Sequence, residues 1–206
     1  LFTLVISSIF LLRPFTVKAD VNVNINKETQ IVTDLIGQYN INYTGDANFF
    51  GFYGYYENNN YNEMVKDTDF KTTVDTIGKG KIVNSSIASL KKTDGATQIE
   101  AAYLVWETSV QGKNNTDLVK KAANKAVYFA GSTDKGAFTK KVNASYAAVD
   151  MREPHLGTKE YTFSCMYVDV TSVVQKYGYG KYGVANIPYV ESTEKSNTSK
   201  GTHSGE

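Results

Sequence analysis

The sequence contains a single cysteine, Cys165, so no disulfide can form within the chain. Secreted eukaryotic domains often carry paired cysteines, because disulfides supply stability that a small core cannot. If this chain is exported, its domain must be held together by a hydrophobic core. Asn-x-Ser/Thr triplets are present, but we interpret them as chance in a chain rich in these residues; they stand at Asn42, Asn84, Asn114, Asn143 and Asn197. Together these features indicate a Gram-positive exporter.

Histidines are also scarce, since His155 and His203 are the only two. With one cysteine they are too few for a zinc site. The motifs of metalloproteases, α/β-hydrolases, P-loop enzymes and dinucleotide-binding enzymes are absent from the sequence. Gly45 to Asn48 faintly resembles an oxygen-ligand loop for calcium, but the pattern is incomplete and we interpret it as a turn. We therefore expect no metal, no cofactor and no catalytic residues.

Carboxylates are not scarce, and a glycosidase needs only two of them about 5 to 10 Å apart. The nearest candidates are Glu100, Glu107 and Asp169, which flank apolar positions of predicted strands. Carboxylates are most often simply exposed. We interpret these three as solvated charges and keep a hydrolase as the least favoured hypothesis.

The chain lacks an excess of either charge, with 22 basic and 21 acidic residues and a net charge of +1. No cluster of Lys or Arg stands out in the sequence. This composition favours neither nucleic acid nor an anionic membrane surface as a partner.

The N-terminal apolar run, Leu1 to Leu12, is too short to span a membrane, which requires about 20 apolar residues. Arg13 and Pro14 end it, and Val17-Lys18-Ala19 resembles a cleavage site for signal peptidase. A buried terminal strand or helix, or a short anchor, is the alternative. We interpret residues 1–19 as a signal peptide that lacks its own N-terminus. The mature chain would then be secreted or attached to the cell wall, with membrane contact only before cleavage.

Two segments have apolar side chains on both faces of a predicted strand, Ile99–Thr108 and Tyr161–Val170. Strands of this kind lie in the middle of a packed sheet, so we expect Trp106 and Cys165 to point into the core. Cys165 would then be a small apolar side chain without a redox task.

Other strands are predicted from period-two alternation; they are Val21–Ile25, Tyr39–Tyr43, Lys125–Ala130, Lys141–Val149 and Gly183–Ile187. Asp169 or Thr171 can cap a short helix that Gly178 ends, and Asp117–Asn124 favours a further helical turn. The sequence therefore predicts an all-β fold, an antiparallel β-sandwich of jelly-roll type over residues 20–190, with one short helix near 171–177. Residues 191–206 are polar and aperiodic, and indicate a loop or linker at a truncated C-terminus.

The segment from Phe49 to Tyr61 combines aromatic residues with glycine and asparagine. Aromatic faces beside amides and hydroxyls suit a sugar-binding platform, and tyrosine also suits an adhesive loop. A strand pair that fills the core is the alternative. The candidate ligand-binding residues of this segment are Phe50, Phe52, Tyr53, Tyr55, Tyr56, Asn59 and Tyr61.

The run Tyr161–Ile187, with Ala101–Ser109 and Lys125–Ala130, resembles the N-terminal β-sandwich of Gram-positive cell-surface proteins that carry adhesin-stalk or DUF11-type repeats. The resemblance covers roughly Lys81 to Ile187 and contains no catalytic signature. It implies a β-sandwich, a surface location and a role without established catalysis. In that group a further Gly-Trp strand follows the polar loop, and this sequence does not reach it.

These observations favour a non-catalytic exported surface module, structural or adhesive, whose partner would be a host-surface protein or a glycan. The alternative is a carbohydrate-binding, lectin-like module that uses the aromatic segment 49–61. Some surface domains of this build form Lys-Asn or Lys-Asp isopeptide bonds, but no spacing in the sequence identifies such a triad, and we assign none.

Overall fold

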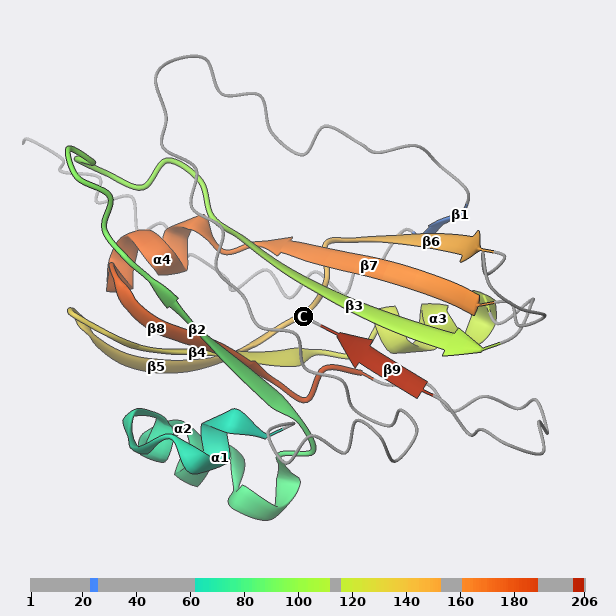
Figure 1. Cartoon of the computed structure of the whole chain (residues 1–206), viewed down its shortest axis with the longest axis horizontal. Coiled ribbons are helices and arrows are strands. Elements are labelled where there is room, and N and C mark those ends of the chain that lie inside the picture. Colours follow the sequence, from blue (N-terminus) through green and yellow to red (C-terminus); the bar gives the residue numbers. More distant parts are fainter. Residues whose placement is uncertain (1–22, 26–61, 112–115, 153–160, 189–201, 206) are drawn as a thin grey trace, which may run out of the picture.

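The computed structural model describes residues 23–25, 62–111, 116–152, 161–188 and 202–205. Its strands form one five-stranded and one four-stranded sheet, which lie one above the other (Figure 1). Neighbouring strands run antiparallel except for the pair β1–β6. The expectation of a mostly β chain built from antiparallel sheets with few helices is confirmed, and the arrangement is consistent with a β-sandwich.

The five-stranded sheet contains both strands that were predicted to lie at the centre of the fold. Its order is β1 (Val23–Ile25), β6 (Tyr146–Arg152), β7 (Tyr161–Asp169), β3 (Tyr103–Gln111) and β9 (Thr202–Gly205). β3 and β7 pair along their whole length. β3 begins and ends a few residues later than predicted. β9 lies within 191–206, the segment for which the sequence predicted a loop or linker.

The four-stranded sheet has the order β2 (Ser85–Leu90), β8 (Gly180–Ala185), β4 (Val127–Thr133) and β5 (Gly136–Val142). The predicted strands 125–130 and 183–187 correspond to β4 and β8 with shifted ends. The predicted strand 141–149 is wrong, because it joins the end of β5 to the start of β6, and these belong to different sheets. Ala144 in the connection is buried, so the apolar alternation continues across the break.

The core lies between the two sheets. At its centre Trp106 and Met166 from the five-stranded sheet meet Val127 and Val184 from the four-stranded sheet. Trp106 is 0% exposed, which confirms the prediction that it is buried. A second part of the core, around Phe129, extends toward one end of the sheets; its other buried members are Phe138, Val170, Val174 and Tyr182.

Cys165 does not point into this core, contrary to the prediction. Ser164 and Met166, its neighbours in β7, are buried, whereas Cys165 is half-buried. Side chains of a strand alternate between faces, so Cys165 lies on the outer face of the five-stranded sheet. Both faces of β7 are apolar in sequence, and alternation alone therefore could not show which face meets the other sheet.

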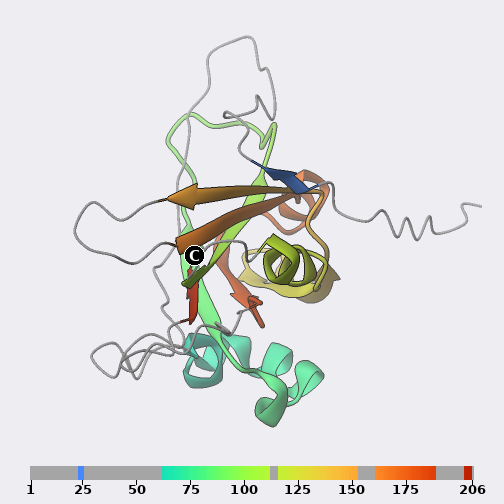
Figure 2. The same ribbon diagram turned by 90° about the vertical axis from the view of Figure 1, so that its right-hand side faces the viewer.

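A layer of short helices covers the outer face of the four-stranded sheet (Figure 2). It consists of α1 (Glu63–Lys66), η1 (Thr68–Phe70), α2 (Lys71–Ile77) and η2 (Lys79–Lys81). These helices and the sheet share their own apolar cluster, whose buried members are Met64, Phe70, Val74, Ile77, Ile82, Ala130 and Ala185. No sequence pattern predicted this layer.

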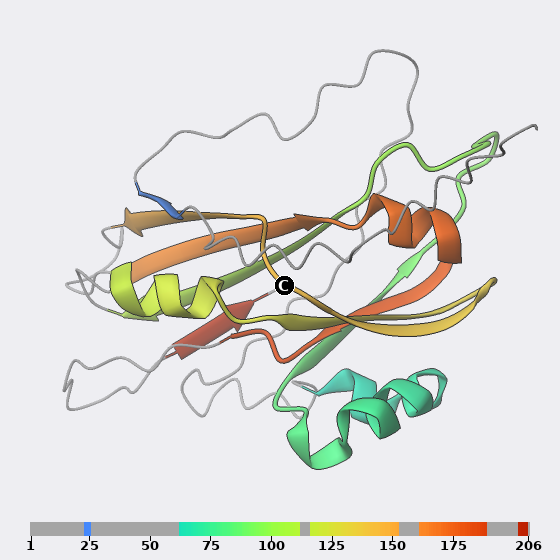
Figure 3. The same cartoon turned by 180° about the vertical axis from the view of Figure 1, so that it is seen from behind.

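Two further helices flank the core, one toward each end of the sheets (Figure 3). α4 (Thr171–Tyr177) confirms the helix predicted near 171–177. Asp169 accepts a hydrogen bond from the amide of Thr171 at 2.8 Å, and Gly178 ends the helix with a φ of +78°. α3 (Thr116–Ala123) matches the weaker prediction at 117–124, and it buries Ala122 and Ala123.

Candidate functional site

The aromatic site residues predicted from the sequence lie outside the described residues, as do His155 and the calcium-like turn. The described chain resumes directly after this segment, at Asn62, whose side chain is fixed to the edge of the four-stranded sheet. Its amide nitrogen donates to the carbonyl of Ile82 at 2.8 Å, and its amide oxygen accepts from the Ser85 hydroxyl at 2.6 Å. The residue that directly follows segment 49–61 is therefore hydrogen-bonded to Ser85, the first residue of β2.

Of the three candidate carboxylates, Glu107 lies far from Asp169 along the sheet. Glu100 precedes β3 and is exposed, and its carboxylate accepts a hydrogen bond from Gln98. Glu107 and Asp169 are exposed on the outer face of the five-stranded sheet. The residue opposite Glu107 is Cys165, so four positions of β7 separate it from Asp169. At about 3.3 Å per strand residue, that is roughly 13 Å, more than a glycosidase pair allows.

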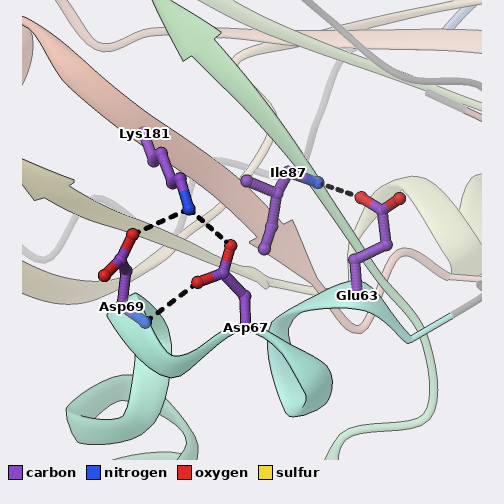
Figure 4. A network of polar contacts seen from close by, with 5 residues as sticks. All are labelled: Glu63, Asp67, Asp69, Ile87 and Lys181. Atoms are coloured by element: carbon purple, nitrogen blue, oxygen red, sulfur yellow. Dashed lines mark hydrogen bonds and ion pairs between the residues drawn. The ribbon is translucent and has the colours of Figure 1, made fainter.

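The most developed polar cluster joins β8 to the helical layer (Figure 4). Lys181 Nζ lies 2.8 Å from Asp67 Oδ2 and 2.7 Å from Asp69 Oδ2. The other oxygen of Asp67 accepts the amide of Asp69 at 2.9 Å. One lysine of the sheet thus binds two carboxylates at the start of η1.

The charges of this cluster stabilise each other. The hydrogen bond from Lys181 lowers the pKa of Asp67, and its two carboxylate partners raise the pKa of Lys181. To act as a nucleophile, the Lys181 amine would have to be neutral. To form an isopeptide bond between Lys181 and Asp67, the carboxyl group of Asp67 would have to be neutral as well. The cluster therefore favours a salt bridge that anchors the helices, and it disfavours both a catalytic lysine and an isopeptide bond.

Glu63 makes a second polar link between the helical layer and the sheet (Figure 4). Its Oε2 accepts the backbone amide of Ile87 at 2.7 Å. Ile87 belongs to β2, which is an outer strand of its sheet. The carboxylate thus takes the place that a neighbouring strand would occupy.

Two weakly acidic side chains of the described chain have raised pKa values. Burial raises the pKa of the Cys165 thiol, and the negative charge of Glu107 adds to the effect. Burial also raises the pKa of Tyr182 to about 12, with a contribution from Asp134. Both groups are therefore neutral at physiological pH, and neither is activated as a nucleophile.

A group of three tyrosines lies on the outer face of the five-stranded sheet. We call it the tyrosine face and define it as Tyr103, Tyr146 and Tyr167 with Val105. The Tyr167 ring packs against Tyr146 at 5.3 Å between centroids, and against Tyr103 edge-to-face at 6.2 Å. Val105, opposite Tyr167, is 48% exposed. From the sequence, Tyr103 and Tyr167 were expected in core strands, and Tyr146 in the shorter predicted strand 141–149.

Two of the asparagines in Asn-x-Ser/Thr triplets, Asn84 and Asn143, are among the described residues, and they differ in solvent exposure. Asn84 is 2% exposed, and its amide both donates to and accepts from the backbone of Ile187, at 2.9 and 2.8 Å. This asparagine is a structural link between β2 and the chain after β8. Asn143, between β5 and β6, is exposed.

The described part of the chain contains no group of three or more His, Cys, Asp or Glu side chains that could hold a metal ion. None of its helices is both long and apolar enough to cross a membrane. Comparison with protein-family models, with curated proteins and with solved structures found no match.

Proposed function

We propose that this chain is a non-catalytic exported module of a cell surface, with a structural or adhesive role. The observation that carries the proposal is the tyrosine face, where large rings and the exposed Val105 lie on a regular sheet. Tyrosine gives a large contact area at small cost in conformational entropy. Because β3 and β7 also supply Trp106 and Met166 to the core, the strands that carry this face are anchored by buried side chains.

The proposal includes an antiparallel β-sandwich of jelly-roll type. The chain passes between the sheets repeatedly, since β4 and β5 lie in one, β6 and β7 in the other, and β8 again in the first. Such alternation is a property of jelly rolls. The resemblance of residues 81–187 to the N-terminal sandwich of Gram-positive adhesin-stalk or DUF11-repeat proteins supports the same assignment.

Export is proposed from residues 1–19, which we assign to a signal peptide. Expression of the chain in a Gram-positive host, with an initiating Met and a short basic segment placed before Leu1, should place the protein in the medium or the cell wall. Mass spectrometry should find Asp20, or a residue within a few positions, as the new N-terminus. Recovery of uncleaved protein from the cytoplasm would contradict export.

Adhesion is tested with purified protein on arrays of extracellular-matrix proteins and glycans. Replacing Tyr103, Tyr146 and Tyr167 by serine should abolish binding while the protein stays folded by circular dichroism. The matched control is Tyr179→Ser, since Tyr179 lies in the turn between α4 and β8, and its backbone is hydrogen-bonded to Asp134 in the β4–β5 turn of the other sheet. Equal loss in the control, or unchanged binding in the triple variant, would refute a role for this face.

The alternative proposal is a carbohydrate-binding, lectin-like module that uses Phe50, Phe52, Tyr53, Tyr55, Tyr56, Asn59 and Tyr61. Its support is the composition of this segment, in which rings stand beside amides and glycines. The same array separates the two proposals. Glycan binding that is lost in Tyr53→Ala and Tyr55→Ala, but retained in the tyrosine-face variant, would favour the lectin.

A further inference from the structure

The connection between β2 and β3 contains the only Asp-Gly pair of the sequence, Asp94–Gly95, and the sequence has no Asn-Gly pair. This connection runs from Lys91 to Ala102 and projects beyond the end of the two sheets (Figure 1). Asp94 and Gly95 are both exposed and form a turn within it. Water therefore reaches both residues in the folded chain.

The backbone nitrogen that follows Asp94 is unhindered. The amide of Ala96 donates to the carbonyl of Thr93 at 3.0 Å, and Gly95 has a φ of +79°, as at the third position of a type II turn. The hydrogen bond that closes such a turn uses the N–H of the fourth residue, not that of the third. Gly95 has no side chain, and a Cβ atom added there would meet no atom within 4 Å. The Gly95 nitrogen is therefore open to approach by the neighbouring carboxyl group.

We propose that Asp94–Gly95 is a modification site at which the folded chain converts aspartate to isoaspartate without an enzyme. The Gly95 nitrogen attacks Cγ of the protonated Asp94 carboxyl group, an N–C bond forms, and the amide proton leaves with the hydroxyl group as water. Water then opens the resulting succinimide ring at one of its two carbonyls. Opening at Cγ restores aspartate, and opening at the main-chain carbonyl gives isoaspartate. One water leaves and one enters, so the mass is unchanged.

The other aspartates of the described chain lack this combination of features. Each precedes a residue with a side chain, which crowds the following nitrogen; they are Asp67, Asp69, Asp75, Asp117, Asp134, Asp150 and Asp169. Two of these carboxylates also accept backbone amides, Asp134 from Tyr179 at 3.0 Å and Asp169 from Thr171 at 2.8 Å. Sequence and structure together therefore single out Asp94 among the described aspartates.

The rearrangement changes the backbone between two fixed points. Before the turn, Leu90 pairs with Gly180 of β8. After it, Gln175 donates to the carbonyl of Ile99 at 2.7 Å, and the Ala102 amide donates to the Thr171 hydroxyl at 2.9 Å. Isoaspartate lengthens the main chain by one atom, which the exposed turn absorbs, so both sheets keep their arrangement. The product is a substrate for enzymes that methylate isoaspartyl carboxylates with S-adenosylmethionine. This inference holds whether or not the chain is exported.

The test is to incubate the full chain for weeks at body temperature in neutral buffer and to map its tryptic peptides. We expect peptide 93–113 to split into two species of equal mass, one of which accepts a methyl group from an isoaspartyl methyltransferase. Asp94→Glu, which would have to close a larger ring, should give no second species. Gly95→Ala should slow its formation at least about tenfold, a barrier higher by about 1.4 kcal/mol. Asp75→Glu is the matched control at an exposed position of α2, and it should behave as the native chain does.

A synthetic peptide of residues 91–98 gives the rate without the fold. If the peptide isomerises and the folded chain does not, the turn protects Asp94 and the proposal is wrong. Equal accumulation of isoaspartate at Asp75 or Asp134 in the folded chain would also overturn it. Isoaspartate formed from asparagines is distinguished by its peptide and by its mass, which deamidation changes. Circular dichroism and urea unfolding of the converted chain should match those of the fresh chain, and a loss of structure would refute the claim that the turn absorbs the change.

Discussion

Trp106 on β3 lies directly opposite Met166 on β7, and neither side chain is exposed to solvent. Both point toward the four-stranded sheet, where Val127 and Val184 complete the contact. The indole nitrogen of Trp106 has no hydrogen-bond partner among the described residues. Trp106 therefore stabilises the fold through its apolar area and packing rather than as a hydrogen-bond donor.

Trp106→Ala should lower the free energy of unfolding by about 3 to 5 kcal/mol, because it removes the largest buried side chain and leaves a cavity. Trp106→Phe should cost less, since it keeps a ring and breaks no hydrogen bond within the described structure. Urea unfolding measures both values. A loss below about 1 kcal/mol for Trp106→Ala, the size of a surface effect, would contradict the packing described for β3 and β7.

Asp67 should make stability depend on pH in the acid range. Its pKa is lower in the folded protein than its ordinary value, because Lys181 binds the charged form. Such a group adds stability above its unfolded pKa, which is about 3.9, and that stability is lost as pH falls through the folded pKa. The free energy of unfolding should therefore decline below about pH 4.

Two variants test this assignment. Asp67→Asn should make the decline of unfolding free energy with falling pH less steep. Asp75→Asn, a change at an exposed position of α2, should leave the decline as it is. Equal slopes in both variants would argue against this salt bridge in solution.

Local sequence pattern predicted the elements whose signal lies within one segment. β3 and β7 were predicted because apolar side chains occupy both faces of each strand. α4 was predicted because a capping carboxylate, valines at helical spacing and Gly178 stand together. The helical layer was missed because its apolar residues do not form one continuous helical pattern. Asp67 ends α1, and Gly78 ends α2 with a φ of +93°.

The polar cluster could not be predicted for a different reason. Lys181 and Asp67 are 114 positions apart, and nothing local distinguishes this pair from the other lysines and carboxylates. The tyrosine face was missed because Tyr103 and Tyr167 fit equally well into a core. Which face of a sheet is covered depends on the other layers, and this information is not present in the strand itself.

Cys165 should react slowly with thiol reagents in the folded protein. The thiolate is the reactive form, and burial together with Glu107 raises the pKa of the thiol. The rate should therefore rise only above about pH 8.5, the ordinary cysteine value. Glu107→Gln should shift this profile to lower pH, while Glu100→Gln, which changes an exposed carboxylate before β3, should leave it unchanged. Rapid labelling at neutral pH would show that the thiol is more accessible than the structure indicates.

Gly183 should prove essential to the contact between the helical layer and the four-stranded sheet. A Cβ atom at this position would lie 2.4 Å from Met64 Cε and 2.9 Å from the carbonyl oxygen of Ser86. The Met64 side chain can move, but it is 0% exposed and fills the cluster beneath α1, and the Ser86 carbonyl belongs to the neighbouring strand. Gly183→Ala should therefore destabilise the protein by about 1 to 3 kcal/mol, as overpacked cores do.

Gly80→Ala is the matched control for this prediction, because Gly80 lies in η2 of the same layer and a Cβ there would meet no atom within 4 Å. Hydrogen exchange adds a readout that locates the effect. In Gly183→Ala the amides of α1 and α2 should exchange faster, while those of β3 and β7, which lie in the other sheet, should change less. If Gly183→Ala and Gly80→Ala are equally stable, α1 does not pack on β8 as closely as described. The helical layer would then be a loosely attached element rather than an integral part of the fold.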